Sequence, residues 1–127
     1  MKTATILIAD DEVALRFLLS ETLVDEGYEV QEASDGQEAL DQLKSKPFDL
    51  IILDYMMPEL TGVEVCEWLR GMENPNQHTP VILLTAKAQE KDRERARDVG
   101  VSRYMIKPFS PLQLLDVIAE LLEPGES

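Results

Sequence analysis

Short runs of apolar residues alternate along the chain with longer stretches in which apolar positions recur every three or four residues. The short runs predict strands at residues 6–9, 28–33, 50–53, 81–84 and 103–106. The third run, Leu50-Ile51-Ile52-Leu53, has no polar position, which is typical of a strand buried on both faces of a parallel sheet. Between the runs, apolar spacings of i, i+3 and i+4 predict helices.

The first helix follows the first strand and ends near Gly27, because a glycine commonly closes a helix in the left-handed conformation. Its predicted inward face consists of Leu15, Leu18, Leu19, Thr22 and Leu23. A charge-rich helix extends from about Ala88 to near Gly100, with a thin apolar stripe. The predicted inward stripe of the last helix consists of Leu114, Val117, Ile118, Leu121 and Leu122.

Three of the helices begin with residue pairs that have the spacing of a capping box. These pairs are Ser34 with Gln37, Thr61 with Glu64, and Ser110 with Gln113. Strands and helices thus alternate strictly, which predicts an α/β fold with a doubly wound, five-stranded parallel sheet and helices on both faces. We expect one domain over residues 1–123, followed by a tail at 124–127.

The overall charge of the chain limits its partners. Twenty-five acidic and twelve basic residues give a formal net charge of −13, so direct binding to nucleic acid or to an anionic membrane surface is not expected. A single cysteine, Cys66, excludes an intrachain disulfide, and no apolar run is long enough to span a membrane. These features predict a cytoplasmic location.

Polar side chains stand at the end of four predicted strands. They are Asp10 and Asp11 after the first strand, Asp54 after the third, Thr85 after the fourth and Lys107 after the fifth. Because parallel strands with right-handed crossovers end at the same edge of a sheet, these groups should converge there, where ligands of such sheets bind.

These residues and their neighbours resemble the receiver domain of two-component response regulators, the CheY-like family. The matching pieces are Asp10-Asp11, the stretch Asp54-Tyr55-Met56-Met57-Pro58 with Gly62, Thr85-Ala86 and Lys107-Pro108. The resemblance covers the whole chain, and it implies the flavodoxin-like strand order 2-1-3-4-5. It also implies a signalling switch rather than an enzyme, one that catalyses only its own phosphotransfer and autodephosphorylation.

The resemblance assigns the phosphoryl acceptor and a metal site. Asp54 is expected to take a phosphoryl group from a histidine kinase or a histidine phosphotransfer protein. The reaction would need Mg²⁺ or Mn²⁺, held by Asp11, Asp54 and the backbone carbonyl of Met56, while Asp10 would act mainly through a bound water. Oxygen ligands of this kind suit Mg²⁺.

The remaining family positions would bind the phosphoryl group and report its presence. Lys107 and Thr85, with the backbone amide of Ala86, would contact phosphoryl oxygens, and a cis bond before Pro108 would direct the lysine into the site. Thr85 and Tyr104 would relay the change to the face formed by the charge-rich helix, the strand at 103–106 and the last helix. A downstream protein effector would bind this face, and a weak homodimer through it is a further option.

Three other functions compete with this interpretation. A flavodoxin-like carrier of FMN needs a phosphate-binding loop after the first strand, where this chain has Asp10-Asp11-Glu12. A phosphatase of the haloacid dehalogenase type has Asp-x-Asp there and a cap domain. A receiver that binds its partner without phosphorylation would usually have lost a site residue. We expect a stand-alone receiver, with the receiver part of a larger regulator as the alternative.

Overall fold

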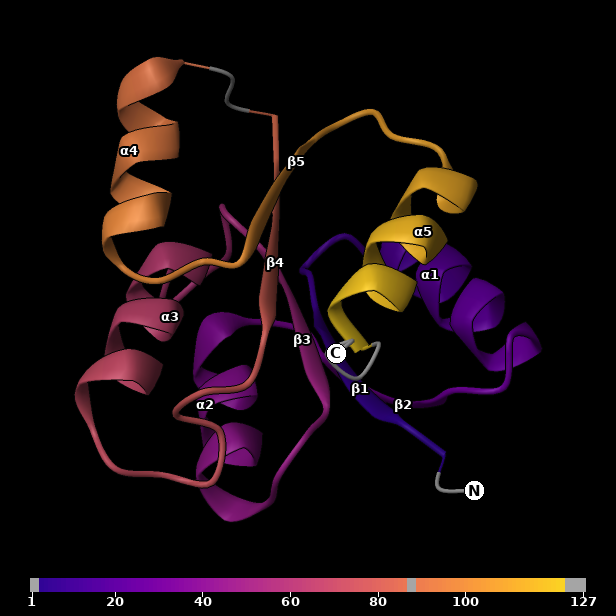
Figure 1. Cartoon of the computed structure of the whole chain (residues 1–127), viewed down its shortest axis with the longest axis horizontal. Helices are drawn as coiled ribbons and strands as arrows, with labels where there is room; N and C mark the ends of the chain where they lie inside the picture. The colour runs from indigo at the N-terminus through magenta and orange to yellow at the C-terminus, as the bar shows by residue number, and fades with distance from the viewer. Residues whose placement is uncertain (1–2, 87–88, 123–127) are drawn as a thin grey trace.

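The computed structural model describes residues 3–86 and 89–122. Within these residues, strands and helices alternate as the sequence predicts (Figure 1). The strands are β1 (Thr5–Ala9), β2 (Glu29–Ala33), β3 (Leu50–Asp54), β4 (Val81–Thr85) and β5 (Arg103–Ile106). The helices are α1 (Val13–Asp25), α2 (Gly36–Ser45), α3 (Gly62–Gly71), α4 (Glu90–Asp98) and α5 (Pro111–Leu122).

The five strands form one parallel sheet in the order β2-β1-β3-β4-β5. The predicted fold class and the strand order implied by the resemblance are both confirmed. β1, β3 and β4 lie inside the sheet, and β3 and β4 are buried at every position. The predicted tail at 124–127 and the predicted helix start at Ala88 lie outside the described residues.

Alternate residues of each central strand enter different cores, because successive side chains of a strand point to opposite faces. Ile6, Ile8 and Ile52 pack with α1 and α5, whereas Leu7, Ile51 and Leu53 pack with α2, α3 and α4. Figure 1 shows the two helix groups on opposite sides of the sheet. The predicted stripe of α5 is confirmed, since all five of its residues belong to the first of these cores.

Two of the three predicted capping boxes are confirmed, and the third is wrong. Thr61 and Glu64 cap α3 reciprocally, as Ser110 and Gln113 do for α5. At α2, however, the side chain that accepts the bond from the N–H of Glu38 belongs to Asp35. Asp is as good a cap as Ser, and here it is Asp35 rather than Ser34 that stands directly before the first helical residue.

The predicted inward face of α1 is also partly wrong, because Leu18 is 49% exposed. The buried stripe contains Leu19 and Leu23, while Phe17 and Val24 face outward with Leu18. Apolar residues occur almost all round this helix, so their spacing alone does not identify the side that meets the sheet.

None of the helices in the described ranges combines the length and apolarity needed to cross a lipid bilayer.

The loop after α3 is held by one buried side chain that the sequence does not single out. Asn76 is fully buried, accepts a hydrogen bond from the N–H of Phe48 and donates to the carbonyls of Leu43 and Lys46. These bonds satisfy backbone groups where α2 ends and β3 begins, so Asn76 fixes the approach of the chain to the strand that ends in Asp54.

Candidate functional site

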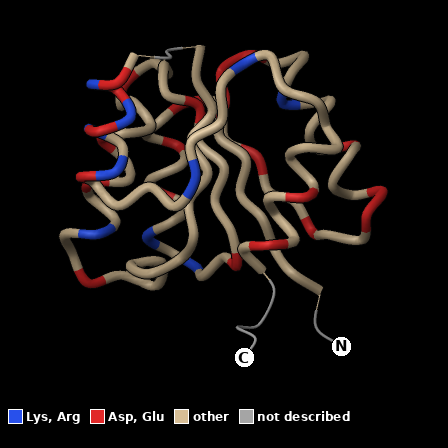
Figure 2. Tube along the Cα trace, turned by 45° about the horizontal axis from the view of Figure 1, so that its top comes forward, with Lys and Arg blue, Asp and Glu red and all other residues tan. Residues whose placement is uncertain are grey.

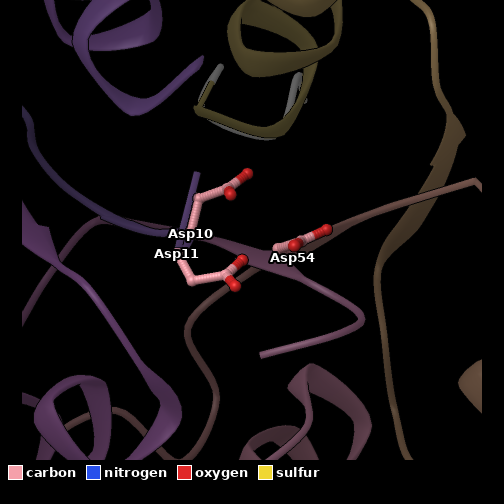
Figure 3. A group of neighbouring side chains, drawn as sticks. All are labelled: Asp10, Asp11 and Asp54. Carbon is pink, nitrogen blue, oxygen red and sulfur yellow. The ribbon is translucent and has the colours of Figure 1, made fainter. Parts of the chain in front are cut away.

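Three carboxylates meet at the carboxyl edge of the sheet. Asp10 and Asp11 directly follow β1, and Asp54 is the last residue of the adjacent β3. One oxygen of each lies within 4.8 Å of the others, and Figure 3 shows Asp10 and Asp11 extending toward the side of Asp54. The predicted convergence is therefore found in the fold.

The three acids differ in burial. Asp10 is fully buried, Asp54 is 6% exposed and Asp11 is exposed. A ligand arriving from solvent meets Asp11 first and the two buried carboxylates behind it. Because β1 and β3 are buried strands of a packed sheet, their ends hold Asp10 and Asp54 in fixed relative positions.

Lys107 provides the positive charge of the site. Its Nζ lies 3.0 Å from Oδ1 of Asp54, 3.6 Å from Oδ2 of Asp10 and 3.9 Å from Oε1 of Glu12. Lys107 follows β5, and its N–H donates to the carbonyl of Thr85 at 2.7 Å, which ties this turn to the end of β4. The Lys107–Pro108 bond is cis, as the resemblance implies.

Burial dominates the ionisation of the two inner acids. It raises the pKa of Asp54 to about 6, helped by the charges of Asp10 and Asp11 and only partly opposed by the bond to Lys107. Burial also raises the pKa of Asp10. Burial works against the charged form of Lys107, but the hydrogen bond to Asp54 and the charge of Asp10 outweigh it and raise its pKa.

The donor set fits a hard divalent cation. Oδ2 of Asp10 is buried and accepts no hydrogen bond from the described residues, so a strong acceptor faces the cluster with only the ion pair to Lys107. Carboxylate oxygens are the ligands that Mg²⁺ and Mn²⁺ prefer. Met56, whose backbone carbonyl is the further expected ligand, stands two residues after Asp54, and its side chain is exposed.

Thr85 and Tyr104 connect this edge to α4. Thr85 ends β4 and is buried, Ala86 beside it is exposed, and Tyr104 is half-buried in the neighbouring β5. The side chains of Thr85 and Tyr104 are hydrogen-bonded, and the guanidinium of Arg93 lies over the tyrosine ring. Burial, with the charge of Asp92, raises the pKa of Tyr104.

Two residues at the site were missed by the sequence reasoning. Arg16 of α1 donates to the carbonyl of Asp10 at 2.6 Å and pairs with Glu32 of β2 at 2.9 Å, so it holds the turn that carries the acidic pair. Glu12 is a third acid near Lys107. A base five residues after an acidic pair, in the first turn of the following helix, was the available signal for Arg16.

Gly62 lets α3 approach the end of β3. A Cβ atom at this position would lie 2.4 Å from the carbonyl oxygen of Asp54 and 2.7 Å from Cδ1 of Leu83. The N–H of Gly62 donates to the carbonyl of Tyr55. This glycine is therefore required by the close approach of α3 to the end of β3.

Comparisons with known proteins agree with this geometry. The profile of the family described as response regulator receiver domain matches residues 6–119. A curated relative, the alkaline phosphatase synthesis transcriptional regulatory protein PhoP of Bacillus subtilis, is 40% identical over 121 residues, which are 95% of this chain and 49% of that protein. The chain thus spans about half the length of this relative.

Solved structures superimpose over nearly the whole chain. The chemotaxis response regulator CheY4 of Vibrio cholerae is 36% identical with a TM-score of 0.89, covering 95% of this chain and 100% of that one. The receiver domain of the sensor histidine kinase PA1611 of Pseudomonas aeruginosa is 28% identical with a TM-score of 0.87, covering 97% and 100%. That structure has a magnesium ion coordinated in its active-site cleft.

The chain matches about half of PhoP but the whole of the CheY4 chain, so our expectation of a stand-alone receiver stays a prediction. The family match favours a receiver domain over the flavin carrier and the dehalogenase-type phosphatase. On the strength of the profile, the identities and the superpositions, this chain belongs to the family of response regulator receiver domains of two-component systems.

Proposed function

We propose that Asp54 accepts a phosphoryl group from a phosphohistidine of a histidine kinase or a histidine phosphotransfer protein. The observation that carries this proposal is a buried carboxylate with an ammonium group 3.0 Å away and with two further carboxylates, those of Asp10 and Asp11, within 4.8 Å of it. With a pKa of about 6, Asp54 is ionised at neutral pH and available as a nucleophile.

In the transfer, a carboxylate oxygen of Asp54 attacks the phosphorus atom and forms a P–O bond. The P–N bond of the donor breaks, and its electron pair returns to the imidazole nitrogen. Lys107 stands beside the attacking group and offsets the negative charge of the phosphoryl oxygens. Positioning and electrostatic stabilisation are most of what such a transfer requires of a protein.

Asp11, Asp54 and the carbonyl of Met56 would hold Mg²⁺ or Mn²⁺, with Asp10 acting through a water molecule. The bound cation would neutralise charge on the phosphoryl oxygens. This assignment is supported by the exposed position of Asp11 and by the buried, unsatisfied oxygen of Asp10.

The relay begins at Thr85. A phosphoryl oxygen on Asp54 would compete for the Thr85 hydroxyl, which shares a hydrogen bond with Tyr104, and the Ala86 amide would bind a second oxygen. Release of Tyr104 would change the face formed by α4, β5 and α5, where a protein effector binds. Only Ala96 is buried along α4, so a small change in free energy is enough to shift this helix.

The protein in this proposal is a cytoplasmic signal receiver that turns over its own phosphoryl group and no other substrate. Its free, buried cysteine fits a reducing compartment. The effector would be a separate protein, which a stand-alone receiver requires.

Intact-mass measurement after incubation with acetyl phosphate and Mg²⁺ tests the proposal. We expect a gain of one phosphoryl group that disappears without the metal and in Asp54→Asn. Beryllofluoride should perturb the signals of Tyr104 and α4 in the parent protein and leave them unchanged in the variant. Phosphorylation of Asp54→Asn, or a parent protein that responds to neither reagent, would refute it.

A further inference from the structure

A small hollow lies between α4 and β5. Its volume is about 200 Å³, and three arginines line it together with Tyr104: Arg93, Arg97 and Arg103. None of the described residues that line it is acidic. In a chain with a net charge of −13, a hollow lined by three guanidinium groups is an exception to the general charge of the surface.

The arrangement of charge on α4 makes this hollow one-sided. Figure 2 shows acidic and basic positions interleaved along the helix. Arg93 and Arg97, four residues apart, share the flank next to β5, whereas Arg95 lies on the opposite flank and pairs with Glu67 of α3 at 3.6 Å. Asp92 of α4 acts on Tyr104 at the edge of the hollow, but no acid of α4 lines the hollow itself.

Two of the three arginines are held in place by neighbours. The guanidinium of Arg93 lies 5.1 Å from the centre of the Tyr104 ring, and Arg103 forms an ion pair with Glu120 of α5. A guanidinium stacked on an aromatic ring keeps its hydrogen-bonding edge free for a planar anion. Arg93 thus presents an oriented guanidinium to the hollow, whereas Arg103 already has Glu120 as a partner.

We propose that this hollow binds carboxylate side chains of an acidic peptide segment in a partner protein. Arginine recognises carboxylates through two parallel hydrogen bonds, and a volume of about 200 Å³ accommodates one or two such groups. A nucleic acid or a second copy of this chain would bring its own large negative charge against the acidic surface around the hollow. A short acidic segment meets that repulsion over a much smaller area.

This site is also connected to the phosphoryl acceptor, and this part of the inference rests on the function proposed above. Arg93 stacks on Tyr104, Tyr104 is hydrogen-bonded to Thr85, and Thr85 ends the strand beside Asp54. A change at Asp54 that releases Tyr104 would move the surface on which Arg93 rests. Phosphorylation would then alter the affinity for the acidic segment.

Titration with unlabelled hexaglutamate, followed through the Nε–H signals of the ¹⁵N-labelled arginines in the metal-free protein, tests the site. We expect saturable shifts at Arg93, Arg97 and Arg103 at about 50 mM salt, where screening is modest, and no comparable shifts at Arg16 or Arg70. Uniform shifts of all arginines, or none, would overturn the proposal. So would shifts that follow protein concentration without peptide, because they would identify a second copy as the occupant.

A matched pair of double variants separates the site from general charge. Arg93→Gln with Arg97→Gln should weaken binding about fivefold, as the loss of two exposed charge contacts implies. Lys91→Gln with Arg95→Gln removes the same charge from the other flank and should change the affinity less than twofold. Equal weakening by both would overturn the proposal. Adding beryllofluoride together with Mg²⁺, with Mg²⁺ alone as the control, tests the connection separately: an unchanged affinity would refute the phosphorylation link and leave the acidic-segment site standing.

Discussion

Replacement of Asp54 by asparagine should stabilise the metal-free protein at neutral pH. In the folded chain the pKa of Asp54 is raised from 3.8 to about 6, mainly by burial. An acid with a raised pKa binds its proton more tightly when folded, so its stabilising contribution is fully present below pH 3.8 and is lost as the pH rises through about 6. At neutral pH, the ionised Asp54 therefore costs stability.

The size of this cost follows from the shift. A difference of about two pKa units corresponds to about 3 kcal/mol at a pH well above 6, of which about 2 kcal/mol develops between pH 4 and pH 8. Asparagine cannot ionise and so removes the pH-dependent part. In the variant, Lys107 keeps its ion pairs with Asp10 at 3.6 Å and Glu12 at 3.9 Å but loses the one with Asp54. The loss of that ion pair offsets part of the stabilisation.

Urea unfolding of both proteins in EDTA across this pH range measures the difference. We expect the free energy of unfolding of Asp54→Asn, relative to that of the parent protein, to rise by about 2 kcal/mol as the pH rises from 4 to 8. Asp116→Asn on the exposed side of α5 loses the same charge outside the buried cluster and is the control for the loss of one carboxylate. A difference for Asp54→Asn that does not vary with pH would refute the argument that burial sets the ionisation of this carboxylate.

Three further predictions concern the metal, the buried amide and the close glycine contact. Mg²⁺ at ten times its dissociation constant should raise the free energy of unfolding by about 1.4 kcal/mol, and Asp11→Asn should lose most of this gain in urea titrations; equal gains would contradict the carboxylate site. Asn76→Ala leaves a buried N–H and two carbonyls unpaired and should lower that free energy by about 3 kcal/mol; a loss under about 1 kcal/mol in the same assay would disprove this role. Gly62→Ala would press a methyl group against the carbonyl of Asp54, and should destabilise the fold and slow labelling by acetyl phosphate. Gly71→Ala, where a Cβ meets no atom within 4 Å, is the control, and equal effects would count against the contact.

The fold could be predicted from the sequence because its strands are short apolar runs with sharp ends. Residues 103–106 were predicted as a strand, and β5 has those bounds. The errors fall where several residues satisfy the same local rule. Both Ser34 and Asp35 are good caps, and only the position of the first helical residue selects between them.

The candidate site was predictable to the extent that it lies at strand ends. A parallel sheet brings its carboxyl ends together, so the positions of Asp10, Asp54 and Lys107 followed from the order of elements. The role of Arg16 did not follow, because its bond to a backbone carbonyl depends on how α1 is rotated over β2. The same rotation left Leu18 exposed, so both misses have one cause.

Under the function proposed above, the charges at the site explain why a response to phosphorylation would extend beyond it. Three carboxyl groups, those of Asp10, Asp11 and Asp54, stand at the site with the ammonium group of Lys107. Phosphorylation would turn the Asp54 carboxylate into an uncharged acyl group and add a phosphoryl group of about −2, so the site gains about one negative charge in a partly buried position. The backbone groups around Asp54 are already committed to the sheet, and Lys107 is already paired. In the function proposed above, the Thr85 hydroxyl would exchange its bond with Tyr104 for one with a phosphoryl oxygen, and this exchange would release Tyr104 and, through the stacked guanidinium of Arg93, affect the flank of α4.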